Sequence, residues 1–292
     1  MVSTLSLPPH SFFFSASAFH KDEVRSVGAL LGAAGVMVEP SSVPAPGLAI
    51  RILCARQPFC CGGTSPPLSR RSWRSSAPAL APPSAAQLPE ATPGGSGGGA
   101  DLLPVRSVGV QGDCRSYSYV AGLSTDESPV PWPKLFQLAR LIPRILHNIN
   151  RVVYIWGGRV STSMTEVTPT LLNPTSLNQL RHADQAATEA LQASGYYPRI
   201  AQMPVILVPL DFHRREEAPS CRRSVVLRPF ITADFMTGQP ALPTNDAHTT
   251  DPRYIPAHVV ESMVGKVLES TPMVSRVLYD LTPKPPGTTE WE

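Results

Sequence analysis

The chain has 292 residues and a formal net charge of +3, which argues against a nucleic-acid binder because such proteins usually show a concentrated basic face. No apolar run reaches the roughly 18–20 residues that cross a bilayer, so no membrane association is expected. Five cysteines with no C-x-x-C pair favour neither a disulfide framework nor a zinc site, and they suit a reducing cytosol.

The first hundred residues are rich in Pro, Ser, Ala and Gly and are expected to be mostly loose. Residues 1–19 are predicted to be a disordered leader, since they match no targeting signal well. Within residues 20–56, the patterns predict a short helix over 20–35 and, over 44–54, a Pro/Gly turn that runs into a short strand. Residues 57–100 end in GGSGGGA and are predicted to be a linker, because such sequence buries too little apolar surface to offset chain entropy.

The ordered body is expected over residues 101–292, roughly 190 residues, which is enough to bury a sizeable core. Three amphipathic helices are expected there. The first covers 134–149 and should be kinked at Pro143; the second opens at Asn173-Pro174-Thr175 and stops at Gly195; the third starts at Pro256. Strands are predicted over 106–110, 116–123, 151–156, 203–209, 224–232 and 276–281.

An internal repeat is visible in this body. The words Arg151-Val152-Val153-Tyr154 and Arg276-Val277-Leu278-Tyr279 are similar, and each follows an amphipathic helix that is itself preceded by a β-rich stretch. The repeat predicts two related β–helix–β units. The expected fold is therefore α/β, of the α+β type, with two subdomains over about 101–200 and 201–292. Each subdomain is expected to be a small β-sheet with helices packed on one face.

The C-terminal segment DLTPKPPGTTEWE (280–292) has the chemistry of an anion-binding loop. Its two consecutive prolines limit the entropy lost on binding, and the glycine after them lets the backbone approach a ligand. Lys284 supplies a positive charge, while Thr288 and Thr289 supply hydroxyl groups for phosphate oxygens. On composition alone, a frayed Pro-rich tail remains the alternative.

KPPGTTEWE resembles the terminal signature of GMP synthases. The likeness continues upstream in the same order, through VGVQGDCRSYSYV (108–120), NRVVYIWG (150–157), IAQMPVIL (200–207) and SVVLRPFITADFMTG (224–238). HKDEVR (20–25) and PAPGLAIR (44–51) resemble the end of that family's ATP-pyrophosphatase domain. The resemblance implies a C-terminal dimerisation domain at 101–292, preceded by a remnant of the ATP-pyrophosphatase domain at 20–56.

The resemblance implies a role in the ATP- and glutamine-dependent amination of xanthosine monophosphate (XMP) to GMP, a ligase reaction of purine nucleotide biosynthesis. It also implies that XMP is contacted by Asp113, Gln202, Lys284 and Glu290. Lys284 is assigned to the phosphate by its charge, and the other three suit ribose hydroxyls or base edges. The expected secondary anion contacts are Arg115, Arg223, Arg228, Thr288 and Thr289. For the arginines, salt bridges within or between subunits are the alternative.

Neither catalytic motif of that family occurs in the sequence. There is no Gly-x-Cys-x-Gly for a glutaminase nucleophile and no Ser-Gly-Gly-Val-Asp-Ser loop for ATP phosphates. We therefore expect no catalytic residue and no metal ligand in this chain, which should be inactive alone. The ATP and Mg²⁺ of the complete enzyme would bind elsewhere, with no cofactor held tightly here.

The expected partners are a second copy or a full-length GMP synthase, forming a dimer, and XMP or GMP as a small molecule. Two alternatives stay open. One is a non-catalytic oligomerisation module that pairs with the full-length synthase. The other is a regulator that senses XMP or GMP, although half a site should bind weakly.

Overall fold

The computed structural model describes residues 47–59 and 98–292, apart from 113, 161–163, 215–219 and 234–235. Tertiary contacts divide the chain into Met1–Ala45 and Pro46–Glu292, and the described residues all belong to the second unit. The predicted leader, the predicted helix over 20–35, most of the predicted linker, and Asp113 lie outside the described residues.

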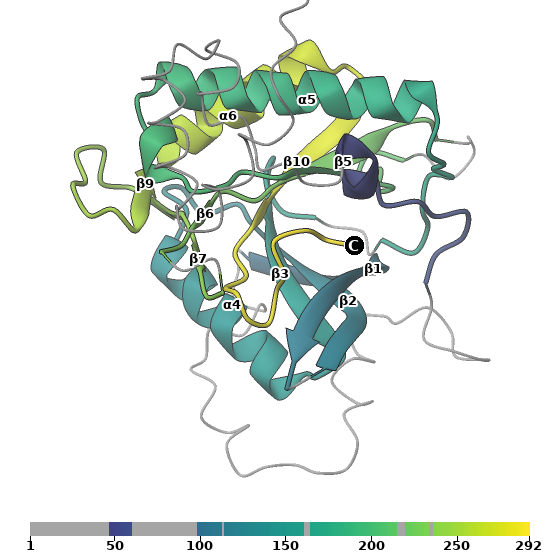
Figure 1. Cartoon of the computed structure of the whole chain (residues 1–292), viewed down its shortest axis with the longest axis horizontal. Coiled ribbons are helices and arrows are strands. Elements are labelled where there is room, and N and C mark those ends of the chain that lie inside the picture. The colour runs from purple at the N-terminus through teal and green to yellow at the C-terminus, as the bar shows by residue number, and fades with distance from the viewer. Residues whose placement is uncertain (1–46, 60–97, 113, 161–163, 215–219, 234–235) are drawn as a thin grey trace, which may run out of the picture. The chain divides into compact units, whose positions relative to one another are not determined.

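A six-stranded sheet forms the centre of the described residues, in the order β1-β2-β3-β10-β5-β4 (Figure 1). Its strands are β1 (Gly98–Gln111), β2 (Cys114–Thr125), β3 (Ile149–Ile155), β4 (Val205–Val208), β5 (Arg223–Leu227) and β10 (Val274–Asp280). Two short pairs lie outside it: β6 (Phe230–Ile231) with β7 (Gln239–Pro240), and β8 (Leu242–Thr244) with β9 (Tyr254–Pro256). The mixed α/β class is confirmed, although β1 begins within the range predicted to be linker.

The two halves of the sheet repeat one another. In the first half, β1 and β2 are antiparallel, and β2 is parallel to β3. In the second half, β4 and β5 are antiparallel, and β5 is parallel to β10. The repeat is therefore confirmed, but β3 and β10 pair antiparallel and join both halves into one sheet instead of two small ones. This pairing satisfies backbone groups that two separate sheets would leave at open edges.

Three helices cover one face of the sheet: α4 (Trp132–Ile145), α5 (Pro174–Ala193) and α6 (Ala257–Ser270). Their apolar side chains form one core cluster with alternate residues of the strands, such as Val152 and Tyr154. The intervening strand residues, such as Val153, form a second cluster on the opposite face with Leu53 and Trp291. Within the part of the chain that is described, no helix has both the length and the apolar character of a membrane crossing.

The helix ends follow their capping residues. Asn173 Oδ1 accepts a hydrogen bond from the Ser176 N–H at 2.9 Å, and Ser176 Oγ accepts one from the Asn173 N–H at 3.2 Å, which opens α5 as predicted. Gly195 follows α5 with a φ of 76°, the backbone conformation that favours glycine after a helix. A single turn of 3₁₀-helix, η3 (Tyr197–Arg199), comes next. The first predicted helix is shorter than expected, because it ends at Ile145 and Ile149 already belongs to β3.

Over the described part of 44–54, the predicted turn is present, but a single β-bridge stands in place of the predicted strand. Leu48–Arg51 form a 3₁₀ turn, η1, in which the Ile50 N–H donates to the Gly47 carbonyl at 3.2 Å. Only then does the chain extend, so that Ile52 forms an isolated parallel bridge with Leu207 of β4. Ile52 and Leu53 are 1% and 4% exposed, which places this segment in the core of the same body as the sheet.

Candidate functional site

The last twelve residues, Leu281–Glu292, fold back onto the sheet and are called the tail below. The tail runs along the outer edge of β1, where the Val108 N–H donates to the Trp291 carbonyl at 2.7 Å and the Val110 N–H donates to the Pro286 carbonyl at 2.7 Å. Figure 1 accordingly places the C-terminus beside β1. The tail is therefore an integral part of the fold, unlike the frayed segment that composition alone left open.

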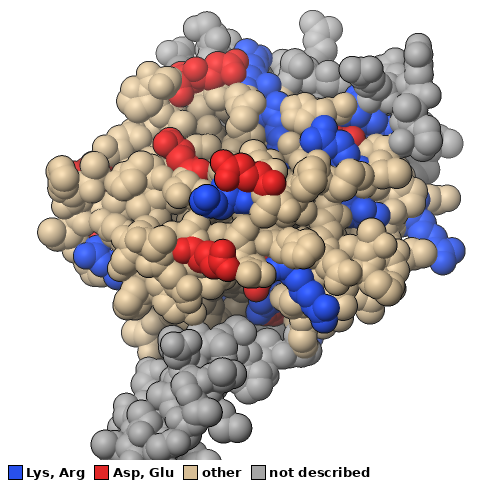
Figure 2. All heavy atoms as spheres, turned by 90° about the horizontal axis from the view of Figure 1, so that it is seen from above, with Lys and Arg blue, Asp and Glu red and all other residues tan. Residues whose placement is uncertain are grey.

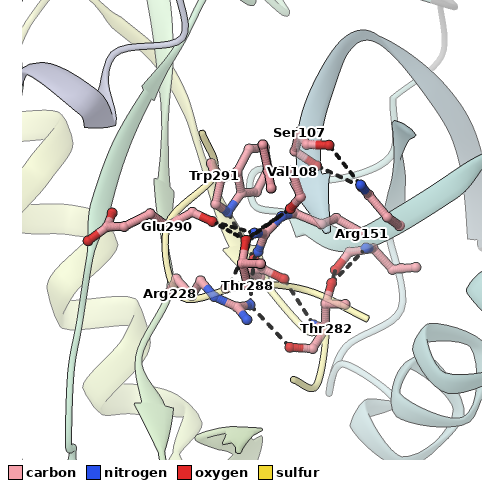
Figure 3. Close-up of polar contacts among 11 residues, drawn as sticks. Ser107, Val108, Arg151, Arg228, Thr282, Thr288, Glu290 and Trp291 are labelled. Carbon is pink, nitrogen blue, oxygen red and sulfur yellow. Dashed lines mark hydrogen bonds and ion pairs between the residues drawn. The ribbon is translucent and has the colours of Figure 1, made fainter. Parts of the chain in front are cut away.

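Arg151 of β3 is the main anchor of the tail. Its side chain is fully buried, and its guanidinium lies 5.0 Å from the centroid of the Trp291 ring. Figure 3 shows tail and strand groups converging on it. The Nη2 group donates to the carbonyls of Val108 (2.9 Å), Thr288 (3.1 Å) and Glu290 (2.6 Å) and to Thr288 Oγ1 (2.8 Å).

Asp280 ties this anchor to a second arginine. Its Oδ2 accepts from Arg151 Nη1 at 3.0 Å, from Arg228 Nη1 at 2.7 Å and from Trp291 Nε1 at 3.0 Å. Burial acts to raise the pKa of Asp280, but Arg228, Arg151 and hydrogen bonds from Thr282 hold it below its ordinary value. The carboxylate is therefore ionised at neutral pH, and one negative charge faces two buried arginines.

This buried cluster carries a surplus of positive charge. Arg228 is 1% exposed, and its Nε and Nη2 groups have no hydrogen-bond partner within the described residues. Burial and the neighbouring Arg228 lower the pKa of Arg151 to about 9, so it stays protonated at neutral pH. A buried cluster with one more cation than anions favours a negatively charged ligand nearby.

Lys284 and Gln202 both lie near the same residue, Phe230. Lys284 and Gly238 exchange backbone hydrogen bonds of 2.8 and 3.1 Å, and Lys284 Nζ lies 6.0 Å from the centroid of the Phe230 ring. Lys284 Nζ also donates to Thr289 Oγ1 at 3.3 Å. The Phe230 N–H donates to the Gln202 carbonyl at 2.8 Å. These contacts bring two predicted substrate residues into one neighbourhood.

Glu290 points out of the buried cluster, as Figure 3 shows. Its carboxylate pairs with Arg51 of η1: Arg51 Nη2 lies 3.0 Å from Oε1, and Nε lies 3.1 Å from Oε2. Both charges of this pair affect the pKa of Asp184 of α5. The pKa of Asp184 is raised, chiefly by burial and further by Glu290, while Arg51 acts in the opposite direction.

Of the two remaining predicted arginines, one lies near the tail and the other does not. Arg115 is exposed and lies opposite Val110, whose N–H donates to the tail, so the tip of the β1–β2 hairpin lies beside the tail. Arg223 instead pairs with Val274, six residues before Asp280, which is about 20 Å away at roughly 3.3 Å per residue. Its guanidinium donates to Thr170 Oγ1 at 2.7 Å and to the Pro169 carbonyl at 3.2 Å. The structure does not bring Arg223 to the tail.

Arg151 and Asp280 were missed as candidate residues. Both lie in words that read as buried strands, INRVVYI and VSRVLYD. A charged residue inside an otherwise apolar strand is rarely buried without a partner. The position of each charge in such a strand therefore indicated a buried ion pair. Nothing in the local pattern told which charge would pair with which.

Residues 189–291 match the family model described as "GMP synthase C terminal domain". That range contains Asp280, Arg228 and all of the tail except its last residue. The chain belongs to the GMP synthase family. The resemblance seen in its sequence is therefore confirmed.

The comparison with curated GMP synthases extends this match over most of the chain. A probable GMP synthase [glutamine-hydrolyzing] of Caenorhabditis elegans is 37% identical over 94% of this chain and 41% of its own length. The GMP synthase [glutamine-hydrolyzing] of Dictyostelium discoideum is 36% identical over 94% of this chain and 39% of its own length. A probable GMP synthase of Leptospira interrogans is 29% identical over the same share of this chain. The chain thus spans about two fifths of the length of these relatives.

On the face of this GMP synthase family member drawn in Figure 2, acidic and basic side chains are interspersed. Among the described residues, no three His, Cys, Asp or Glu side chains are grouped to hold a metal ion. No step through Mg²⁺ is therefore assigned to the described residues.

Proposed function

We propose that the tail of this GMP synthase family member binds a purine nucleotide, XMP or GMP, with its phosphate at Lys284. The observation that carries the proposal is the anchoring of the tail by buried Arg151 and Asp280. A loop that is already held in place loses less conformational freedom when it binds. Its lysine is then presented from a fixed backbone, because Lys284 is also bonded to Gly238.

The charges along the tail give the bound nucleotide a direction. Near its start, the tail carries Lys284 and follows Asp280, the carboxylate that Arg151 and Arg228 both contact. Near its end, Glu290 pairs with Arg51, and the charges of both act on the pKa of a second acid, Asp184. A phosphate is favoured at the first end and ribose hydroxyls at the second, since carboxylates accept hydrogen bonds from hydroxyls.

We assign the wider reaction to the complete enzyme. There, the amination of XMP to GMP would use ATP, Mg²⁺ and glutamine at sites outside the described residues. This chain would supply part of the XMP site and the dimer contact, and alone it should make no GMP. We propose the cytosol as its compartment, in keeping with Cys54, Cys114 and Cys221, which are free and exposed.

A second candidate function is a non-catalytic module that pairs with full-length GMP synthase. It is favoured by the match of residues 189–291 to the family model described as "GMP synthase C terminal domain". Titrating the chain into full-length enzyme, with mass photometry and activity measured together, tests this. Mixed dimers at micromolar concentration support it, and their absence removes it.

The nucleotide proposal is tested by calorimetry with XMP, GMP and xanthosine. Lys284→Ala should weaken XMP binding about tenfold or more, because a charge-assisted hydrogen bond contributes about 1.5–3 kcal/mol. Xanthosine, which has no phosphate, should bind both proteins equally. Lys266→Ala is the matched control, since Lys266 is exposed on α6 and pairs with Glu269 at 3.7 Å. Equal XMP affinities for Lys284→Ala and the wild type would overturn the phosphate assignment.

A further inference from the structure

The Arg51 side chain donates hydrogen bonds to one residue of the tail, Glu290. Among the described residues, its side-chain hydrogen bonds go to both oxygens of Glu290, through Nε and Nη2. This two-point contact fixes the plane of the carboxylate as well as its position. The Arg51 and Glu290 side chains are 10% and 19% exposed, so water screens the pair only weakly.

The segment that carries Arg51 is itself fixed to the sheet. Leu53, two residues later, is 4% exposed, and its N–H donates to the Leu207 carbonyl of β4 at 2.9 Å. Ala55 exchanges hydrogen bonds of 3.1 and 2.8 Å with Thr170. Because this segment is fixed to the sheet, Arg51 can hold the tail in a defined position relative to segment 47–59.

Asp184 of α5 adds to the effect of this ion pair. Burial raises the pKa of Asp184, Arg51 lowers it and Glu290 raises it, so both charges of the pair act on this carboxyl group. Without Arg51, the like charges of Asp184 and Glu290 would lack this compensating cation, which favours displacement of Glu290. Since Asp184 is held by α5, the tail is the part that would move.

We propose that Arg51 is a positioning residue for nucleotide binding, which holds the Glu290 carboxylate and so couples segment 47–59 to the tail. The carboxylate keeps acceptor sites for a ribose hydroxyl, because two N–H groups do not use all of its lone pairs. Arg51 therefore orients Glu290 without blocking it. The role of Arg51 in nucleotide binding rests on the proposed function. The coupling between segment 47–59 and the tail does not require a bound nucleotide.

The coupling is measured first without nucleotide, by hydrogen exchange on the whole chain. Arg51→Gln should speed exchange of the Val108 and Val110 amides, which donate to the tail, about tenfold, while amides between β3 and β10 stay unchanged. Glu290→Gln should do the same. The Arg51→Gln/Glu290→Gln double variant should exchange no faster than either single variant, because both remove the same contact.

Nucleotide binding is then measured by calorimetry with XMP. Arg51→Gln should weaken it about tenfold, and Arg51→Lys should give an intermediate loss, since lysine keeps the charge but lacks the planar fork. Arg214→Gln is the control, because Arg214 pairs with Glu166 in side chains that are 30% and 58% exposed. It should change neither measurement.

Four outcomes would be decisive. If Arg51→Gln leaves hydrogen exchange of the Val108 and Val110 amides unchanged, the coupling is overturned. If the effects of the two single variants on exchange add in the double variant, Arg51 has only a general structural role. Faster exchange with wild-type XMP affinity overturns the positioning role. Failure of the wild type to bind XMP refutes the proposed function, while the exchange data still decide the coupling. If Arg51→Gln also speeds hydrogen exchange of the amides between β3 and β10, the variant disturbs the whole sheet. The coupling is then tested with Arg51→Lys in its place.

Discussion

Replacing Asp280 by asparagine should destabilise the whole fold. The Asp280 carboxylate pairs with the buried guanidinium groups of Arg151 and Arg228, at 3.0 and 2.7 Å. Removing one partner of a buried ion pair costs about 3–5 kcal/mol, because a charge is left unpaired in the interior. Asparagine keeps a hydrogen-bond acceptor, so we expect about 3 kcal/mol. At a slope of about 2 kcal/mol per molar urea, the midpoint should fall by about 1.5 M.

The same substitution should change how stability depends on pH. The pKa of Asp280 in the folded protein lies below its ordinary value of 3.8, so its stabilising contribution is complete above that value. The contribution is lost as the pH falls through the lowered folded pKa. The gap between wild type and Asp280→Asn should therefore be wide at about pH 7 and narrower at about pH 3.

Urea unfolding followed by tryptophan fluorescence is a suitable assay, since the indole of Trp291 donates to Asp280 and reports on the site. Asp251→Asn is the matched control: Asp251 pairs with Arg253 at the surface, and the midpoint should not move measurably. A loss below about 1 kcal/mol for Asp280→Asn would refute the reasoning that this carboxylate compensates two buried cations.

Three further substitutions test other parts of the structure. Asn173→Ala removes the cap of α5 and should cost about 1 kcal/mol in thermal unfolding; no shift in Tm would contradict the capping role. Trp291→Ala empties a site that is 1% exposed and should cost about 3–5 kcal/mol by urea unfolding, unless the tail contributes nothing to the fold. Gly109→Ala would place a methyl group 2.8 Å from Asn150 Nδ2 and the Pro286 carbonyl, so XMP affinity in calorimetry should fall about tenfold; wild-type affinity would show that the tail can shift freely.

The local structure was largely predictable from local sequence. Asn173 and Gly195 marked the ends of α5, because capping depends on a few neighbouring residues. The strand predicted within 44–54 failed because Leu48–Arg51 form a 3₁₀ turn before the chain extends at Ile52. An apolar run of that length does not by itself separate a turn from a strand.

The joining of the two halves could not be predicted in this way. The repeat revealed that Arg151–Tyr154 and Arg276–Tyr279 are equivalent, but equivalence does not say whether two strands pair with each other. Tyr154 lies opposite Tyr279 in the sheet, a contact between residues far apart in the chain. The pairing of Arg151 with Asp280 follows from that contact, so the candidate site was predicted only where the tail itself carried the chemistry.

The order of synthesis gives the tail anchor a kinetic consequence. Arg151 precedes the carbonyls of Thr288 and Glu290 that accept its hydrogen bonds by 137 and 139 residues, so it is synthesised well before them. Burying the guanidinium before these acceptors are present would leave its N–H groups short of partners, which is costly. We therefore expect the docking of the tail to be the step that completes this buried cluster, after the strands around Arg151 have formed.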